Sequence, residues 1–217
     1  MAYMAEAKQS PTASSLILHS PMRYDLLLWL LTFGREARLR ESLLRLAHLI
    51  SGESVLDVGC GTGTLAIGAT KQVGSGGRVE GIDASAQMLE RACRKARRAG
   101  ANVSLKNALA ESLPFPDAEF DAVLSTVMLH HLSDKIRRQS ASEFRRVLKP
   151  GGRVLAVDFG ATPTQKKGIV AHFHRHGHIN LDEMVSLMTT VGLCITEKGD
   201  VGIGGLQFVL APASPRT

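Results

Sequence analysis

The chain lacks the features that mark membrane-spanning, secreted and disulfide-stabilised proteins. Its longest apolar run, Leu26 to Leu31, is far shorter than the roughly 20 residues that cross a bilayer. The N-terminal residues lack the basic-then-apolar order of a secretory signal. The three cysteines, Cys60, Cys93 and Cys194, form neither a Cys-x-x-Cys pair nor an even set, which is typical of free thiols in a reducing compartment. We therefore expect a cytoplasmic protein with no membrane span.

Aromatic residues are also scarce, at 5%, whereas the chain contains 21 glycines. This balance favours an α/β fold with many tight turns over an aromatic-rich β-sandwich. The net charge is +6, and the densest basic run lies at residues 91–98. No aromatic platform accompanies that run, so we interpret it as a solvated helix face and expect no nucleic-acid partner. A length of 217 residues suits one domain with a short appendage.

Short apolar strands alternate with helical patterns from Ser54 onward. The expected strands cover Ser54–Cys60, Arg78–Ala84, Val103–Ala108, Phe120–Met128 and Arg153–Phe159, followed by a hairpin of Cys194–Val201 and Leu206–Ala211. The expected helices cover residues 63–72, Ser85–Ala99, Ser133–Leu148 and Leu181–Val191, with a turn at Lys149–Gly152. The alternation predicts a doubly wound, mostly parallel sheet covered on both faces. Ligand should bind at the carboxyl ends of its strands.

The N-terminal part has a different pattern. Residues 1–14 are small and polar, and Ser15 to Ile50 show helical periodicity with interspersed arginines. We expect residues 1–50 to form a helical lid segment, with Tyr24 facing the ligand cleft, and residues 51–217 to form the globular domain.

A glycine-rich loop follows the first expected strand directly. Glycines at 59, 61 and 63 let the backbone adopt positive φ and approach a ligand closely. A dinucleotide fingerprint that starts at Gly59 would need its third glycine at Thr64, and one that starts at Gly61 would need it at Ala66, which weakens but does not exclude that register. No Gly-Lys-Ser/Thr triplet supports a P-loop. Asp83, at the end of the second strand, can accept both hydroxyls of a ribose, with helix capping as the alternative.

Five segments carry a family resemblance. They are VLDVGCGTGTLA (55–66), GIDASAQML (81–89), AESLPFPDAEFDAV (110–123), LHHLSD (129–134) and RVLKPGGRVLAVDF (146–159). Together they resemble the class I S-adenosylmethionine-dependent methyltransferases, in particular the branch with ubiquinone/menaquinone C-methyltransferases and many small-molecule methyltransferases. These motifs are specific for the cofactor and give almost no information about the acceptor.

The resemblance implies a Rossmann-like, seven-stranded sheet of order 3-2-1-4-5-7-6 with strand 7 antiparallel. It implies that the cofactor is bound by Asp57, Gly59, Cys60, Gly61, Asp83, Ala84, Met88, Leu109, Ala110 and Thr126. The glycine loop would hold the methionine part and Asp83 the ribose, while Ala84 and Met88 would pack on the adenine. The family commonly has an acid where this chain has Leu109, so Glu111, a main-chain carbonyl or a water takes that place, or adenine is bound less selectively.

Histidines are the candidates for contact with the acceptor. His130 and His131 follow the fourth strand on the expected ligand side, where one could act as a base, although packing at a helix start is the alternative. Four others alternate along the chain: His172, His174, His176 and His178. An extended chain would place these four on one face. A substrate contact, with His172 as candidate, a transition-metal site and an ordinary polar loop stay open, and we assign no metal.

The predicted function is in-line methyl transfer from S-adenosylmethionine to a small-molecule acceptor, with S-adenosylhomocysteine as product. A quinone-pathway C-methyltransferase with a lipid-like acceptor and a non-catalytic cofactor-binding protein are the alternatives. An NAD-dependent oxidoreductase is disfavoured by Thr64, and three scattered cysteines argue against arsenite methylation.

Overall fold

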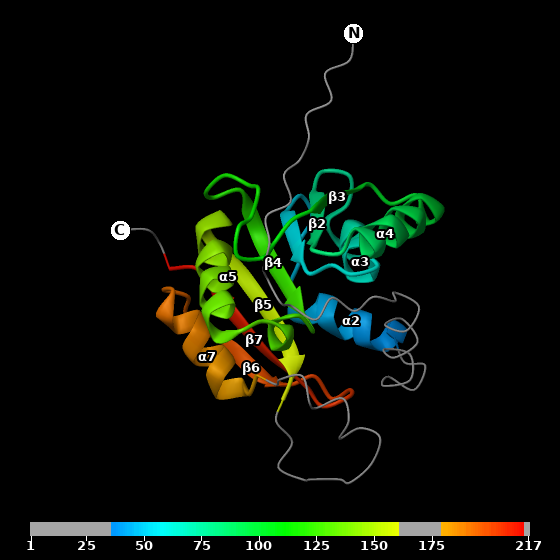
Figure 1. Cartoon of the computed structure of the whole chain (residues 1–217). Coiled ribbons are helices and arrows are strands. Elements are labelled where there is room, and N and C mark those ends of the chain that lie inside the picture. The colour runs from blue at the N-terminus through cyan, green and yellow to red at the C-terminus, as the bar shows by residue number, and fades with distance from the viewer. Residues whose placement is uncertain (1–35, 161–178, 215–217) are drawn as a thin grey trace.

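Seven strands form one sheet in the computed structural model, which describes residues 36–160 and 179–214 (Figure 1). The strands are β1 (Ser54–Val58), β2 (Arg78–Asp83), β3 (Val103–Asn107), β4 (Phe120–Thr126), β5 (Leu148–Phe159), β6 (Glu197–Asp200) and β7 (Leu206–Pro212). The helices are α2 (Glu36–Leu46), α3 (Thr64–Val73), α4 (Ala86–Ala99), α5 (Asp134–Val147) and α7 (Leu181–Thr190), with a 3₁₀ turn η1 (Leu129–His131).

The strand order is β3-β2-β1-β4-β5-β7-β6. Strands β1 to β5 pair in parallel, and β7 runs antiparallel to both β5 and β6. This confirms the predicted doubly wound sheet and its order. The order reverses between β1 and β4, so the topological switch point lies where the carboxyl ends of these two strands meet.

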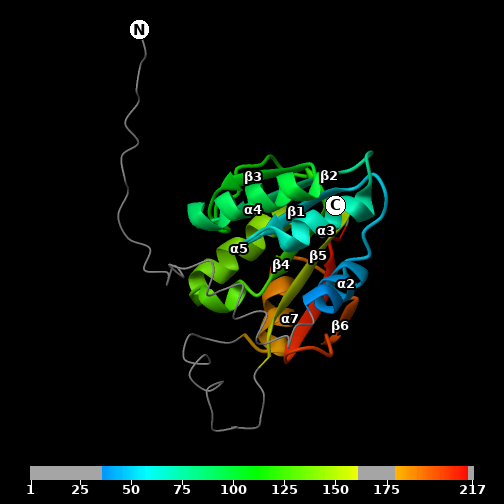
Figure 2. The same cartoon turned by 90° about the vertical axis from the view of Figure 1, so that its right-hand side faces the viewer.

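Helices cover both faces of the sheet. Figure 2 looks onto the face that carries α2, α3 and α4, and α5 and α7 lie on the other face. Leu43 and Leu44 of α2 are buried with Leu155 and Phe208 in the core of the first face. Phe144 and the two buried methionines of α7 belong to the core of the second face. Because its leucines are buried, α2 contributes to the core of the folded unit.

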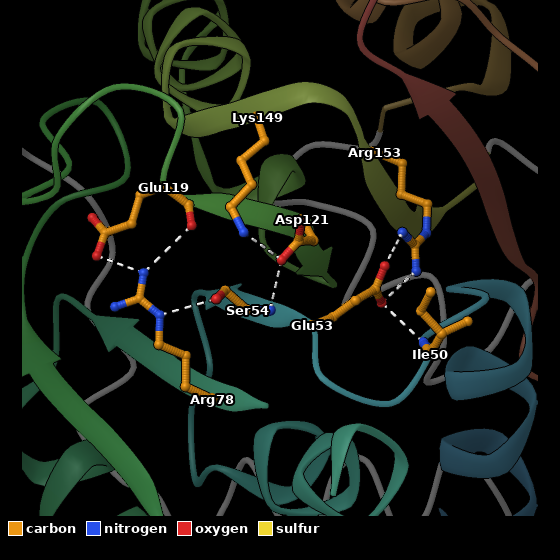
Figure 3. A network of polar contacts seen from close by, with 8 residues as sticks. All are labelled: Ile50, Glu53, Ser54, Arg78, Glu119, Asp121, Lys149 and Arg153. Atoms are coloured by element: carbon orange, nitrogen blue, oxygen red, sulfur yellow. Dashed lines mark hydrogen bonds and ion pairs between the residues drawn. The ribbon is translucent and has the colours of Figure 1, made fainter. Parts of the chain in front are cut away.

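Polar contacts join the amino ends of the strands (Figure 3). Arg78 at the start of β2 donates to Glu119 at 2.7 Å and to Ser54 Oγ at 3.1 Å. Asp121 of β4 accepts from the backbone N–H of Ser54 at 2.8 Å and from Lys149 Nζ at 2.7 Å. These pairs hold neighbouring strands in register at the amino edge, while the carboxyl edge holds the glycine loop.

The helical segment predicted up to Ile50 is wrong over its last residues, because α2 ends at Leu46. Arg153 of β5 donates from Nε to the carbonyl of Ala47 at 2.7 Å and from Nη2 to that of His48. His48 has a φ of 47°, so the chain turns there. A tertiary contact therefore ends the helix, and residues 15–35 of the predicted segment lie outside the described residues.

The turn predicted at Lys149–Gly152 lies inside β5. Leu148 pairs with Phe120 and Arg153 with Ala122, and the register between β4 and β5 shifts within that interval. The turn residues are therefore part of β5 and form an irregularity in its pairing with β4, where Gly151 has a φ of 76°.

Other strand boundaries also differ from the prediction; β1, for example, ends at Val58 instead of Cys60. The chain leaves β4 at Thr126 and forms η1, where we predicted strand up to Met128. Strand β6 begins at Glu197 instead of Cys194. The predicted cap of α4 is confirmed, because Ser85 Oγ accepts from the N–H of Met88. Within the described ranges, no helix combines the length and the apolar character needed to cross a bilayer.

Candidate functional site

The glycine loop between β1 and α3 has a left-handed backbone at three positions. The φ angles of Gly59, Gly61 and Gly63 are 72°, 54° and 75°, which side-chain-bearing residues rarely adopt. A Cβ at Gly59 would lie 2.6 Å from Cγ of Met128, and one at Gly63 would lie 2.9 Å from Cβ of Ala92. Larger residues would therefore be both strained and obstructed at these positions.

Asp57 lies at the end of β1, beneath this loop. It is 1% exposed, and neither carboxylate oxygen has a hydrogen-bond partner among the described residues. Burial is the main cause that raises the pKa of Asp57 from 3.8 to about 7; the nearby Asp83 adds to this rise, and the N–H of Ala66 opposes it from close by without forming a hydrogen bond. A buried carboxylate without a donor is costly, so this position is suited to a ligand that brings a positive charge or a donor.

Asp83 lies at the end of β2 and faces the same loop. Its Oδ2 accepts from the N–H of Gly61 at 2.9 Å, and its Oδ1 accepts from that of Ser85 at 2.8 Å. Burial raises the pKa of Asp83, while these two backbone N–H groups lower it. Each oxygen retains a lone pair, so the carboxylate can still accept from a ligand hydroxyl.

Cys60 lies within the loop and is buried. Burial raises the pKa of its thiol well above the usual range, and the carboxyls of Asp57 and Asp83 raise it further. The thiol therefore stays protonated.

The expected adenine-binding residues lie beyond β2 and β3. Met88 is buried on α4, whereas Ala84 is exposed and Leu109 is 48% exposed. The N–H of Ser112 donates to the carbonyl of Leu109 at 3.2 Å, which closes a tight turn around Ala110. An exposed leucine beside a small residue leaves an apolar surface for a flat ring.

A side-chain pair on α5 holds the segment that follows this turn. Arg146 donates to the carbonyls of Leu113 and Phe115 at 3.1 and 2.8 Å, and Glu143 accepts from the N–H of Leu113 at 2.8 Å. The hydrogen bond from Arg146 lowers the pKa of Glu143. These contacts fix the backbone just after the predicted adenine site.

The two histidines after β4 differ in their surroundings. The His130 side chain is 10% exposed and lies 2.6 Å from Asp158, whereas His131 is exposed. Thr126 ends β4 next to them and is half-buried. Sequence reasoning missed Asp158; its only signal was an acid near the end of the fifth strand, one strand away from the histidines.

Other expected residues lie outside the described ranges. These are Tyr24 and the alternating histidines His172, His174, His176 and His178. Among residues 36–160 and 179–214, no three His, Cys, Asp or Glu side chains gather as metal ligands would.

Comparisons with known proteins agree with this geometry. Residues 55–152 match the family model described as a methyltransferase domain. The demethylmenaquinone methyltransferase of Thermus thermophilus is 38% identical over 148 residues, which are 68% of this chain and 66% of that protein. These matches identify the chain as a relative of the class I S-adenosylmethionine-dependent methyltransferases.

Solved structures show how widely the fold of this chain is shared. An S-adenosylmethionine-dependent methyltransferase from Aquifex aeolicus superposes with a TM-score of 0.73 at 23% identity, over 89% of this chain and 98% of that chain. The cyclase SpnF superposes with a TM-score of 0.70 at 21% identity, over 82% of both chains. A shared fold therefore does not by itself fix the reaction. The chain spans just under two thirds of the length of its Thermus relative.

Proposed function

We propose that this chain transfers the methyl group of S-adenosylmethionine to a small-molecule acceptor. The observation that carries the proposal is the unpartnered carboxylate of Asp57 beneath a loop with three left-handed glycines, with the Asp83 carboxylate on the neighbouring strand. The cofactor has a positively charged sulfonium and ammonium group and a ribose. The buried carboxylate of Asp57 fits the positively charged groups, and the neighbouring carboxylate of Asp83 at the switch point fits the ribose.

The contacts proposed for the cofactor are those that the family resemblance implies, and the positions of the residues are compatible with them. The backbones of Gly59, Cys60 and Gly61 would lie along the methionine part, above Asp57. Asp83 would accept the ribose hydroxyls. The remaining contacts are proposed for Ala84 and Met88 on the adenine face, Leu109 and Ala110 at the adenine edge, and Thr126 near the methionine carboxylate. The protein's contribution is then orientation, because the sulfonium supplies the reactive methyl group when it is bound.

The acceptor is a further proposal. The relative from Thermus thermophilus is named as acting on demethylmenaquinone, so a quinone-like ring is the second candidate acceptor. We further propose that residues 1–50, with Tyr24, and the segment around His172 border the acceptor pocket, and that the protein acts in the cytoplasm.

Calorimetric titration with S-adenosylmethionine, with NADH as the control ligand, tests the proposed class. Micromolar binding of S-adenosylmethionine alone supports it and leads to a screen of phenols, amines, thiols and quinols. Binding of NADH alone would make the protein an oxidoreductase, and cofactor binding without turnover would make it a non-catalytic binding protein.

Replacing Asp83 with alanine should weaken S-adenosylmethionine binding more than tenfold. The lost hydrogen bonds to a charged group are worth about 1.5–3 kcal/mol, and about 1.4 kcal/mol corresponds to tenfold in Kd. Calorimetry at neutral pH measures the change. Asp182→Ala removes an exposed carboxylate of α7 and should leave Kd unchanged.

Asp83 also accepts from two backbone N–H groups, so its replacement could weaken binding by disturbing the glycine loop. A comparison of two ligands, one with and one without the ribose hydroxyls, separates this effect from lost ribose binding. Asp83→Ala should weaken S-adenosylhomocysteine much more than an analogue that lacks the ribose hydroxyls. An equal loss for both ligands would place the ribose elsewhere.

A further inference from the structure

A histidine and an aspartate form a close pair at the carboxyl ends of β4 and β5. His130 Nδ1 lies 2.6 Å from Asp158 Oδ1. The backbone N–H of His130 donates to Oδ2 at 3.0 Å, and that of Phe159 donates to Oδ1 at 2.8 Å. Asp158 is 0% exposed. The carboxylate is therefore fixed by two backbone groups, and the imidazole is its third partner.

This arrangement sets the hydrogen position on the ring. An ionised carboxylate only accepts hydrogen bonds, so the bond at Nδ1 places the ring hydrogen there. The other ring nitrogen, Nε2, then has a free lone pair and can take a proton. The ring is also held by its neighbours, since its centroid lies 3.8 Å from that of His131 and 5.5 Å from that of Phe159. His130 is thus fixed in one orientation and one tautomer.

The backbone before His130 is strained. Val127 has a φ of 54°, which is unusual for a β-branched residue, and its N–H donates to the carbonyl of Val157 at 2.7 Å. Such a conformation is energetically unfavourable and persists where the surrounding structure enforces it, often at functional sites. Here it turns the chain from β4 into η1 and brings the backbone N–H of His130 onto Asp158.

The same turn places the pair beside the cofactor loop. Met128, which follows Val127, packs directly against Gly59 of that loop. Strands β1, β4 and β5 are adjacent in the sheet, so the loop after β1 and the pair after β4 and β5 lie along one edge. Arg137 of α5 donates to the carbonyl of Leu129 at 2.9 Å and anchors the start of η1. The pair therefore lies next to the place where we propose the methyl group is presented.

We propose that His130 accepts the proton of a neutral hydroxyl group on the acceptor, and that Asp158 is the positioning residue that orients His130. The substrate class is then an alcohol or a phenol. The O–H bond breaks and its proton moves to Nε2, the oxygen electron pair forms the bond to the methyl carbon, and the carbon–sulfur bond electrons go to sulfur. This inference rests on the proposed methyl transfer.

Kinetics on a matched acceptor panel test this inference. Phenol, aniline and thiophenol share a ring, and only the phenol must lose a proton from a neutral hydroxyl to become a good nucleophile; alkyl alcohols, amines and thiols extend the panel. His130→Gln should lower kcat for the phenol about 100- to 10,000-fold, the range of general-base catalysis, and leave the Kd of S-adenosylmethionine unchanged. His48→Gln, an exposed histidine paired with Glu197, is the matched control and should behave as the parent does.

The Asp158→Asn variant tests whether Asp158 orients His130 or only stabilises the fold. It should lower kcat for the phenol by about tenfold or more with little change in acceptor KM, because the amide no longer fixes the tautomer. Residues that act as a unit are not additive, so the double variant should be no slower than His130→Gln. With nitrophenols that are already ionised at the assay pH, all variants should approach the rate of the parent protein.

A second measurement does not require turnover. Nitrogen-15 NMR of neutral His130 in the cofactor-free protein should show the hydrogen on Nδ1, and a hydrogen on Nε2 would overturn the inference. It would also be overturned if only amines or thiols were methylated, or if His130→Gln methylated neutral phenol at the parent rate; either result leaves the methyltransferase proposal intact. Failure to bind S-adenosylmethionine would defeat the proposed function itself, and binding without turnover of any acceptor would defeat both proposals.

Discussion

Asp57→Asn should weaken S-adenosylmethionine binding more than tenfold and, at the same time, stabilise the cofactor-free protein above pH 7. Asp57 is buried without a hydrogen-bond partner among the described residues, and burial raises its pKa from 3.8 to about 7. Between these two pH values the folded protein keeps a proton that the unfolded chain has released. The free energy of unfolding therefore falls as pH rises through this window and stays lower above it.

The expected size of this effect follows from the pKa difference. The interval from 3.8 to about 7 corresponds to about 4 kcal/mol of lost stability at full ionisation. Asparagine has a similar shape and cannot ionise, so the variant should escape this loss. Urea unfolding at pH 5 and pH 8 should show a stability advantage of Asp57→Asn that grows with pH. An advantage that is constant, or absent at pH 8, would mean that the carboxylate is not buried as described.

The same carboxylate should couple cofactor binding to proton release. A positive ligand group favours ionised Asp57, so binding at pH 6 should release a proton from part of the population. Calorimetry in two buffers with different ionisation enthalpies measures that release, which Asp57→Asn should abolish and Asp182→Asn should leave unchanged. Stability and binding would then move in opposite directions at a single residue, as is common at functional sites.

Residues whose surroundings are set locally were predictable from the sequence. The glycine spacing at 59, 61 and 63 predicted the left-handed loop, and the acid at 83 followed from its place at the end of the second strand. Both depend on a strand, a turn and a helix that are consecutive in the chain. The strand order, by contrast, followed from the family resemblance, because alternation alone does not say which strands pair.

Features that depend on distant pairing were not predictable. His130 and Asp158 are 28 residues apart, and only the β4–β5 pairing brings them together. The predicted turn at Lys149–Gly152 had the correct turn residues, yet the sheet incorporated it into β5. The end of α2 was placed too late because the side chain that takes its carbonyls, Arg153, lies about a hundred residues further on. In each case tertiary contacts overrode a local preference.

The largest effect expected on folding alone is at the Arg153–Glu53 pair on the amino edge (Figure 3). The guanidinium donates to both carboxylate oxygens, at 2.7 and 2.8 Å, and the side chains are only 16% and 10% exposed. Arg153→Ala would leave Glu53 buried without its charge partner and the carbonyl of Ala47 without its donor. Breaking a buried pair in this way costs about 3–5 kcal/mol, which chemical denaturation can measure.

Two comparisons separate this explanation from a simple loss of packing. Arg153→Met combined with Glu53→Leu removes both charges, and its cost should be clearly less than the sum of the two single changes, because no buried charge remains. Glu90→Ala breaks the exposed pair with Arg94 on α4, where the side chains are 70% and 55% exposed, and should cost about 0.5 kcal/mol or less. If the cost of the double variant equalled the sum of the costs of the two single variants, the two charges would act independently. Since this pair lies at the opposite edge from the glycine loop, Arg153→Ala should also leave the Kd for S-adenosylmethionine unchanged at temperatures where the variant is folded, whereas Asp57→Asn should change it.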